Sequence, residues 1–126
     1  MKLQLVAKGK GEMDYDGEND ILSFNIKDRE YWKSLEFDDI VLDLDKDGFI
    51  VGIEIFCASK MFKIDKASIK RIKNWEFSTK VESNIIKIQL RFESRLNNVV
   101  VKGTENFIRE AEYPLRDSEV LCTINA

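Results

Sequence analysis

The sequence predicts a mainly β protein, an antiparallel sandwich or open barrel of about eight strands with one short helix. Apolar and polar residues alternate over several short segments that are rich in Ile, Val, Leu and Phe. Turn-forming Gly, Asn, Asp and Ser separate these segments at a spacing too short for the crossover helices of a parallel sheet. Because the chain has one proline and no Ser/Gly-rich linker, we expect a single domain over residues 1–126.

The expected elements follow the alternation along the chain. It predicts strands at 21–26, 40–44, 49–56 and 84–92, with weaker signals at 107–113 and 119–124. Two segments break this rhythm: residues 28–39 indicate a helical turn, and residues 65–73 predict the short helix. In the second segment Asp65 is the expected N-cap, with Ile69 and Ile72 on one helical face.

A weak internal similarity suggests a duplicated four-strand unit. Residues 18–26 align with 82–90, residues 39–42 with 98–101, and residues 48–54 with 106–112. Residues 63–126 would then form the helix and a second β-meander. The alternative is that amphipathic hairpins resemble one another without common descent.

Composition narrows the functional classes. The chain has no histidine, which removes Ser-His and Cys-His nucleophile pairs and the commonest zinc ligands. We therefore assign no catalytic residues, and the composition argues against an enzyme without excluding one based on carboxylates. No apolar run is long enough to span a membrane and the first residues lack a secretion signal, so we expect a cytoplasmic protein without a membrane partner. Cys57 and Cys122 lie in apolar contexts and are expected to be buried thiols.

The net charge of −3 conceals a strong asymmetry. Residues 12–54 contain fourteen acidic and four basic residues, whereas residues 60–80 contain seven basic and two acidic residues. Such asymmetry marks a partner surface or one half of a fold that complements the other.

Residues 43–54, DLDKDGFIVGIE, match every fixed position of an EF-hand calcium loop. The flanks oppose that reading, because the helix before the loop would bury Asp38 and Asp39, and the segment after it is β-branched with Gly52 inside. A β-hairpin with a turn at Asp47-Gly48 fits better. It pairs Leu44 with Val51, Leu42 with Ile53 and Ile40 with Ile55 on one apolar face.

A hairpin still leaves room for a cation. If residues 12–15, 21–26, 40–44 and 49–56 are successive antiparallel neighbours, the turns at 16–20 and 45–48 lie at the same end of the sheet. Five carboxylates would then form an acidic rim: Asp16, Glu18, Asp20, Asp45 and Asp47. Such a rim suits Ca²⁺ or Mg²⁺, or a basic partner, while the alternative is ordinary turn chemistry without any cofactor.

Residues 13–62 also resemble a small prokaryotic family catalogued as domain of unknown function 2283. The resemblance is carried by Tyr15, Asp16, Glu18, Asp20 and Leu22, and by the stretch VLDLDKDGFIVGIEIFCAS. Ile50 departs from the family pattern, which is often polar there. The resemblance implies a compact β-rich fold and a prokaryotic cytoplasmic origin, and it transfers no activity. Members of this kind resemble antitoxin-like partners of small toxins.

The favoured function is a non-enzymatic module that acts through protein–protein contacts and self-associates, with a dimer favoured because open sheets leave unpaired edge strands. The alternative is a divalent-cation-binding or metal-dependent protein that uses the acidic turns at 16–20 and 43–54. The third reading is a weak nucleic-acid binder that uses the basic segment 60–73, although the acidic chain as a whole disfavours it. Its candidate contact residues are Lys63, Lys66, Lys70, Arg71 and Lys73. We expect Tyr31 and Trp32 either to contact a partner or to close the open end of the barrel or sandwich.

Overall fold

The fold is known from a computed structural model, which describes residues 5–112 and 114–125. One nine-stranded sheet has the strand order β3-β4-β5-β2-β1-β9-β6-β7-β8. The strands are β1 (Leu5–Asp16), β2 (Ile21–Ile26), β3 (Tyr31–Glu36), β4 (Ile40–Asp45), β5 (Ile50–Phe56), β6 (Asn74–Glu82), β7 (Ile85–Leu96), β8 (Val99–Glu110) and β9 (Ser118–Asn125). Two short helices, α1 (Ala58–Phe62) and α2 (Lys66–Arg71), connect β5 to β6.

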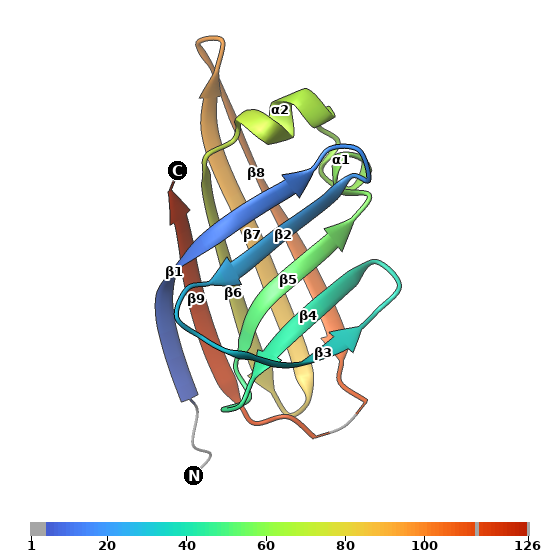
Figure 1. The fold of residues 1–126 in the computed structure, drawn as a ribbon, viewed down its shortest axis with the longest axis vertical. Coiled ribbons are helices and arrows are strands. Elements are labelled where there is room, and N and C mark those ends of the chain that lie inside the picture. Colours follow the sequence, from blue (N-terminus) through green and yellow to red (C-terminus); the bar gives the residue numbers. More distant parts are fainter. Residues whose placement is uncertain (1–4, 113, 126) are drawn as a thin grey trace.

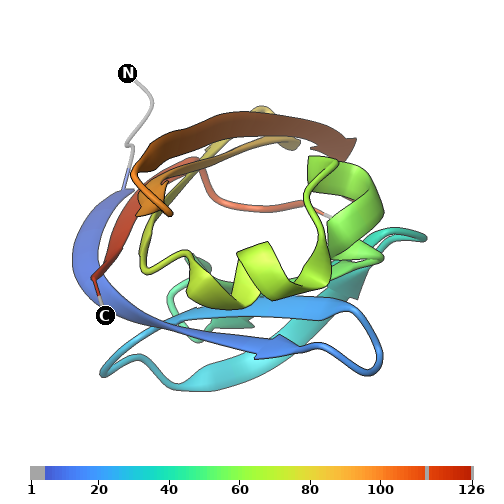
Figure 2. The ribbon, with the colours of Figure 1, turned by 90° about the horizontal axis from the view of Figure 1, so that it is seen from above.

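The sheet curls into a half-barrel of two layers (Figure 1, Figure 2). We call β2, β3, β4, β5 and the second half of β1 the front layer, and β6 to β9 the back layer. Strand β1 joins them, because residues 5–10 pair in parallel with β9 and residues 11–16 pair antiparallel with β2. Gly11 permits this passage, since a Cβ there would lie 2.3 Å from the sulfur of Cys122.

The core lies between the two layers. Phe24 of the front layer contacts Trp75 and Phe77 of the back layer, with ring centroids 5.2 and 6.2 Å apart. Phe62 of α1 packs edge-on against Trp75 and Phe92, which closes the core at the end that carries the helices. Trp75 and Phe77 are buried in this core.

The mainly β prediction is confirmed, as is the helix at 65–73. Strand β2 has the predicted bounds, and Asp65 caps α2 by accepting a hydrogen bond from the backbone amide of Ser68 at 2.7 Å. The helical turn expected at 28–39 is wrong, because residues 31–36 form the edge strand β3. Alternation there is weak since only Leu35 is buried, and pairing with β4 decides the conformation.

The β4–β5 hairpin confirms most of the predicted register. Ile40 pairs with Ile55, Leu42 with Ile53 and Asp43 with Gly52. The pairing of Leu44 with Val51 is wrong: a bulge follows Asp43 and Leu44 pairs with Ile50. Beyond the bulge the backbone amide of Asp45 donates to the carbonyl of Phe49 at 3.0 Å, so the turn is longer than the two residues predicted.

The proposed internal duplication does not appear as a repeated hairpin. Residues 39–42 and 48–54 belong to two strands joined by a turn. Residues 98–101 and 106–112, which were aligned with them, fall largely within the single continuous strand β8. Among the described residues, no helix is both long enough and apolar enough to cross a membrane.

Candidate functional site

The acidic rim predicted from two turns does not form. Ile21 pairs with Phe56 and Asn25 with Gly52, so β2 lies antiparallel to β5 rather than to β4. The 16–20 turn therefore lies at the end of the sheet near the helices, and the 45–49 turn lies at the opposite end (Figure 1). The inserted strand β3 accounts for the difference, because it reverses the chain once more before β4 begins. Across the described ranges, no group of three or more potential side-chain ligands lies close enough together to hold a metal ion.

Asp20 has a structural role at the first turn. It is 9% exposed with φ of 57°, and its carboxylate accepts hydrogen bonds from the Tyr15 hydroxyl at 2.6 Å and the Ser59 hydroxyl at 2.7 Å. The Ser59 amide donates to the same carboxylate at 3.0 Å. Burial acts to raise the pKa of Asp20, but these hydrogen bonds outweigh it and hold the pKa below its usual value. Burial and the contact with Asp20 raise the pKa of the Tyr15 hydroxyl.

The other two predicted ligands of this turn have different surroundings. Asp16 accepts hydrogen bonds from the amides of Glu18 and Asn19 at 3.0 and 3.1 Å, which is ordinary turn chemistry. Glu18 is exposed at the tip of the turn.

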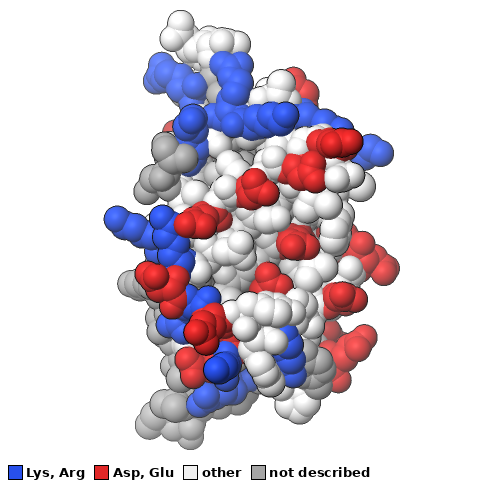
Figure 3. Space-filling model, in the orientation of Figure 1, with Lys and Arg blue, Asp and Glu red and all other residues white. Residues whose placement is uncertain are grey.

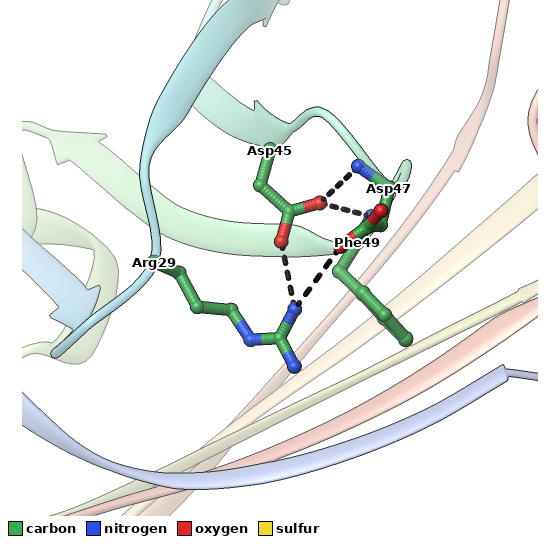
Figure 4. A network of polar contacts seen from close by, with 4 residues as sticks. All are labelled: Arg29, Asp45, Asp47 and Phe49. Atoms are coloured by element: carbon green, nitrogen blue, oxygen red, sulfur yellow. Dashed lines mark hydrogen bonds and ion pairs between the residues drawn. The ribbon is translucent and has the colours of Figure 1, made fainter.

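At the opposite end Asp45 organises the β4–β5 turn (Figure 4). It is 4% exposed, and one carboxylate oxygen accepts from the amides of Asp47 and Phe49, each at 3.0 Å. The other oxygen accepts from the Arg29 guanidinium at 2.9 Å, and that guanidinium lies 4.6 Å from the centre of the Phe49 ring. Asp47 is exposed and lies 3.9 Å from Arg29. Protein donors thus already occupy the Asp45 oxygens that would bind calcium.

An open cavity of about 610 Å³ adjoins this network. Its charged lining mixes four basic and four acidic side chains. The basic ones are Lys10, Lys27, Arg29 and Lys46, and the acidic ones are Asp28, Glu30, Asp45 and Asp47. The balance of signs gives the cavity no preference for an anion or a cation.

The outer face of the front layer is the candidate surface that sequence reasoning did not find. Strand pairing places two rows of residues across β1, β2, β5, β4 and β3 on this face. The rows are Glu12-Asn25-Gly52-Asp43-Ser34 and Asp14-Ser23-Glu54-Val41-Glu36. These rows contain five carboxylates, which we call the acidic face: Glu12, Asp14, Glu36, Asp43 and Glu54. Figure 3 shows Asp and Glu spread over this side of the molecule.

The outer face of the back layer has both signs of charge. Glu76 lies 3.8 Å from Arg91, and Lys80 lies 3.7 Å from Glu82. The acidic part of the sequence therefore lies over the front layer, whereas most of the basic residues of 60–80 lie on and beside the two helices. Acidic residues at alternating positions of the predicted strands indicated that they share a face within each strand. Only the strand order shows that they lie on the same face of the sheet.

The edge strands carry the exposed apolar groups. The large hydrophobic residues that are exposed in the described structure are Tyr31, Trp32, Val99, Val100 and Ile108. Tyr31 and Trp32 lie on β3, and the other three lie on β8. A bulge between Tyr31 and Lys33 leaves Trp32 unpaired, so that its side chain is 53% exposed.

The predicted basic contact residues lie around the helices. Lys66, Lys70 and Arg71 belong to α2, Lys73 follows it, and Lys63 ends α1. All five are exposed. The Arg71 guanidinium donates to the side-chain oxygen of Asn97 at 3.1 Å, which connects α2 to the tip of the β7–β8 hairpin.

Comparisons with known proteins agree with this architecture. A family model described as protein of unknown function (DUF2283) matches residues 12–59. An uncharacterised protein of Methanocaldococcus jannaschii is 33% identical over 111 residues, which is 82% of this chain and 96% of that relative. Residues 12–59 belong to the DUF2283 family. A putative hypoxanthine phosphoribosyltransferase of Methanosarcina mazei is 33% identical over 93 residues, 73% of this chain and 76% of that protein. No solved structure matches the chain.

The DUF2283 segment corresponds to the front layer and the start of α1. Tyr15, Asp20 and Ser59, which carried the resemblance, form the hydrogen-bonded cluster described above. Asp45 and Gly48 form the β4–β5 turn, where Gly48 has φ of 89°. These motif residues therefore stabilise turns, and the acidic face is a separate feature of the same segment.

Proposed function

We propose that this protein is a non-enzymatic interaction module whose acidic face binds a basic surface of a protein partner. The observation that supports this is the segregation of charge: the two rows across the front layer contain five carboxylates and no lysine or arginine. Complementary surfaces of this kind steer association and select partners. By covering a basic surface, such a module would act as an antitoxin-like partner.

Tyr31 and Trp32 supply an apolar anchor beside this face. Ser34 donates a hydrogen bond to Asp43 at 2.9 Å and lies 3.0 Å from the Tyr31 hydroxyl, so the anchor and the acidic face are directly connected. Exposed Tyr and Trp side chains beside a charged surface are typical of residues that dominate binding energy. The partner expected here is basic and has an apolar recess.

The test is calorimetric titration with a lysine- and arginine-rich peptide of fixed sequence. A front variant combines Glu12→Gln, Asp43→Asn and Glu54→Gln. A control variant with the same change in net charge combines Glu93→Gln, Glu110→Gln and Glu119→Gln, all exposed and outside the acidic face. We expect the front variant to bind about tenfold more weakly and the control to bind nearly as the parent does. Equal losses in both variants would contradict a specific surface.

Trp32→Ala tests the anchor separately. Because the contact is apolar, its loss should persist at high salt, where the acidic face is screened. If Trp32→Ala binds as tightly as the parent at every salt concentration, the anchor is not part of the interface.

The M. mazei relative suggests a phosphoribosyltransferase as the competing function. Pyrophosphate groups often bind to free amides at a helix N-terminus. In this protein α1 and α2 have five and six residues, and amides in their first turns already donate to Asp20 and Asp65. We therefore favour the interaction module. Conversion of hypoxanthine with phosphoribosyl pyrophosphate by the purified protein would overturn that choice.

We also propose that the protein self-associates along β8. This edge strand has twelve residues and exposes Val99, Val100 and Ile108, whereas β3 is short, bulged and flanked by charge. A long edge with exposed apolar groups favours strand pairing, and short, bulged edges resist it.

A further inference from the structure

The β7–β8 hairpin projects beyond the rest of the molecule at the end that carries α2 (Figure 1). Asn97 and Asn98 form its tip with φ of 52° and 65°, which is the conformation of a two-residue hairpin turn. Val99 and Val100 follow the tip and are 61% and 48% exposed. The projecting ribbon is therefore not covered by another part of the described chain.

Basic side chains lie at the end of the molecule from which this hairpin projects: Arg71 contacts Asn97 at the tip, and the Lys70 side chain lies against Gly17 in the β1–β2 turn. Lys70 and Arg71 come from α2, Lys73 precedes β6, and Arg95 and Lys102 come from β7 and β8. We call these five residues the basic collar. Figure 3 shows a band of Lys and Arg across this end of the molecule, above the acidic face.

The collar has few ionic partners in the described part of the protein. None of its five residues forms an ion pair within 4.0 Å with a described residue. Two acids lie beside the collar: Asp65, which caps α2 and whose pKa Arg71 helps to lower, and Glu93, which is paired with Lys102 across β7 and β8. Lys66 is not counted in the collar, because it lies near Asp16 and Asp20 and contributes to lowering the pKa of both.

We propose that the basic collar and the hairpin form a contact surface for a nucleic-acid duplex. The collar would contact the phosphate backbone, and the two-stranded ribbon would enter a groove. The Asn98 side chain carries an amide donor and acceptor suited to base edges, the Asn97 amide nitrogen can donate while its oxygen accepts from Arg71, and the valines suit apolar contact. The exposed aromatic residues Tyr31 and Trp32 lie on β3, away from this end, so the surface has no stacking platform for single strands.

The acidic face explains how an acidic protein can bind DNA at one end. Repulsion between the acidic face and phosphates disfavours approach to the front layer and so favours approach at the collar end. Five phosphate contacts predict that the logarithm of the association constant falls with the logarithm of salt concentration with a slope of about −4.5.

The experiment measures fluorescence anisotropy of a labelled DNA duplex of mixed sequence over a range of potassium chloride concentrations. The collar variant combines Lys70→Gln, Lys73→Gln and Arg95→Gln. A control variant with the same change in net charge combines Lys27→Gln, Lys46→Gln and Lys80→Gln, which lie outside the collar. Arg71 is left unchanged because it also holds Asn97.

We expect the collar variant to lose about tenfold or more in affinity and to show a shallower salt slope, with the control close to the parent. Circular dichroism melts verify that each variant is folded. A flat salt response, equal losses in both variants, or tighter binding to single-stranded DNA or to phosphatidylserine vesicles would each overturn the proposal. Since the acidic face and the collar are altered by different substitutions, failure of one proposal is distinguishable from failure of the other.

Discussion

At the scale of single residues, Asp20 holds two segments together that are far apart in the chain. Its carboxylate accepts hydrogen bonds from Tyr15 on β1 and from Ser59 on α1, and its own carbonyl accepts from the amide of Ala58 at 3.1 Å. The first β-hairpin is thereby fixed against the first helix. The Asp20 carboxylate, a candidate metal ligand from the sequence, thus forms hydrogen bonds that stabilise the fold.

Asp20→Asn is expected to reduce the free energy of unfolding by about 2 kcal/mol, because charge-assisted hydrogen bonds are lost in a nearly buried site. The folded-state pKa of Asp20 lies below its unfolded value. Its contribution is therefore complete above about pH 4 and is lost as the pH falls through the folded pKa. Urea unfolding of both proteins from neutral to acidic pH measures this. A constant difference between them down to the lowest pH would contradict the assignment.

The two cysteines differ in a way the sequence did not predict. Cys122 is buried as expected, and burial raises the pKa of its thiol to about 11. Cys57 is exposed, so the expectation that it is buried is wrong. Its position in a left-handed turn before α1, with φ of 55°, places it at the surface.

Thiol titration with Ellman's reagent checks this difference. In the native protein only Cys57 should react rapidly, and denaturant should make Cys122 react as well. Cys57→Ser should abolish the rapid phase. Rapid reaction of a second thiol without denaturant would show that the β9 region opens readily.

At the scale of elements, residues 43–54 match the EF-hand calcium-loop pattern but form the β4–β5 hairpin. Asp45 matches a ligand position of the calcium-loop pattern, but in this structure it accepts hydrogen bonds from the amides of the turn and from Arg29. Asp45→Asn should destabilise the protein by about 2 kcal/mol, since it weakens the hydrogen bonds of a buried carboxylate to the turn amides and to the partly exposed Arg29. Asp47→Asn is the control: Asp47 is exposed, and we expect little change in the melting temperature.

Calcium provides an independent test of this element. Because the acidic turns are at opposite ends and the Asp20 and Asp45 oxygens already accept protein donors, we expect millimolar Ca²⁺, Mg²⁺ or Mn²⁺ to leave the melting temperature unchanged. A rise in melting temperature with one of these ions, absent in Asp45→Asn, would restore the metal hypothesis.

At the scale of the whole molecule, self-association along β8 predicts a concentration-dependent mass. Sedimentation equilibrium should show dimers in the parent, and Ile108→Lys should shift them to monomers because it places charge on the paired edge. Ala67→Lys on α2 adds the same charge at an exposed position away from the edge and should not change the mass. A parent that stays monomeric at all concentrations would refute this pairing.

Local pattern predicted the elements that are governed by neighbouring residues. Strands β2, β4 and β7 alternate clearly because one face of each is buried, β5 alternates from Ile53 onward, and Asp65 begins α2 by capping its first turn. Strand β3 escaped prediction because its exposed edge removes the alternation. Strand β6 was missed because it follows directly after α2, and the basic residues before it obscured its start.

By itself, then, the sequence determined the fold class, the main hairpin register and the charge asymmetry, since periodicity and charge are properties of neighbouring residues. Only the tertiary structure decided which carboxylates meet. Pairing of β2 with β5 separated the two acidic turns and instead aligned Glu12, Asp43 and Glu54 on one face. Strand order depends on contacts between distant segments, and no local pattern encodes it.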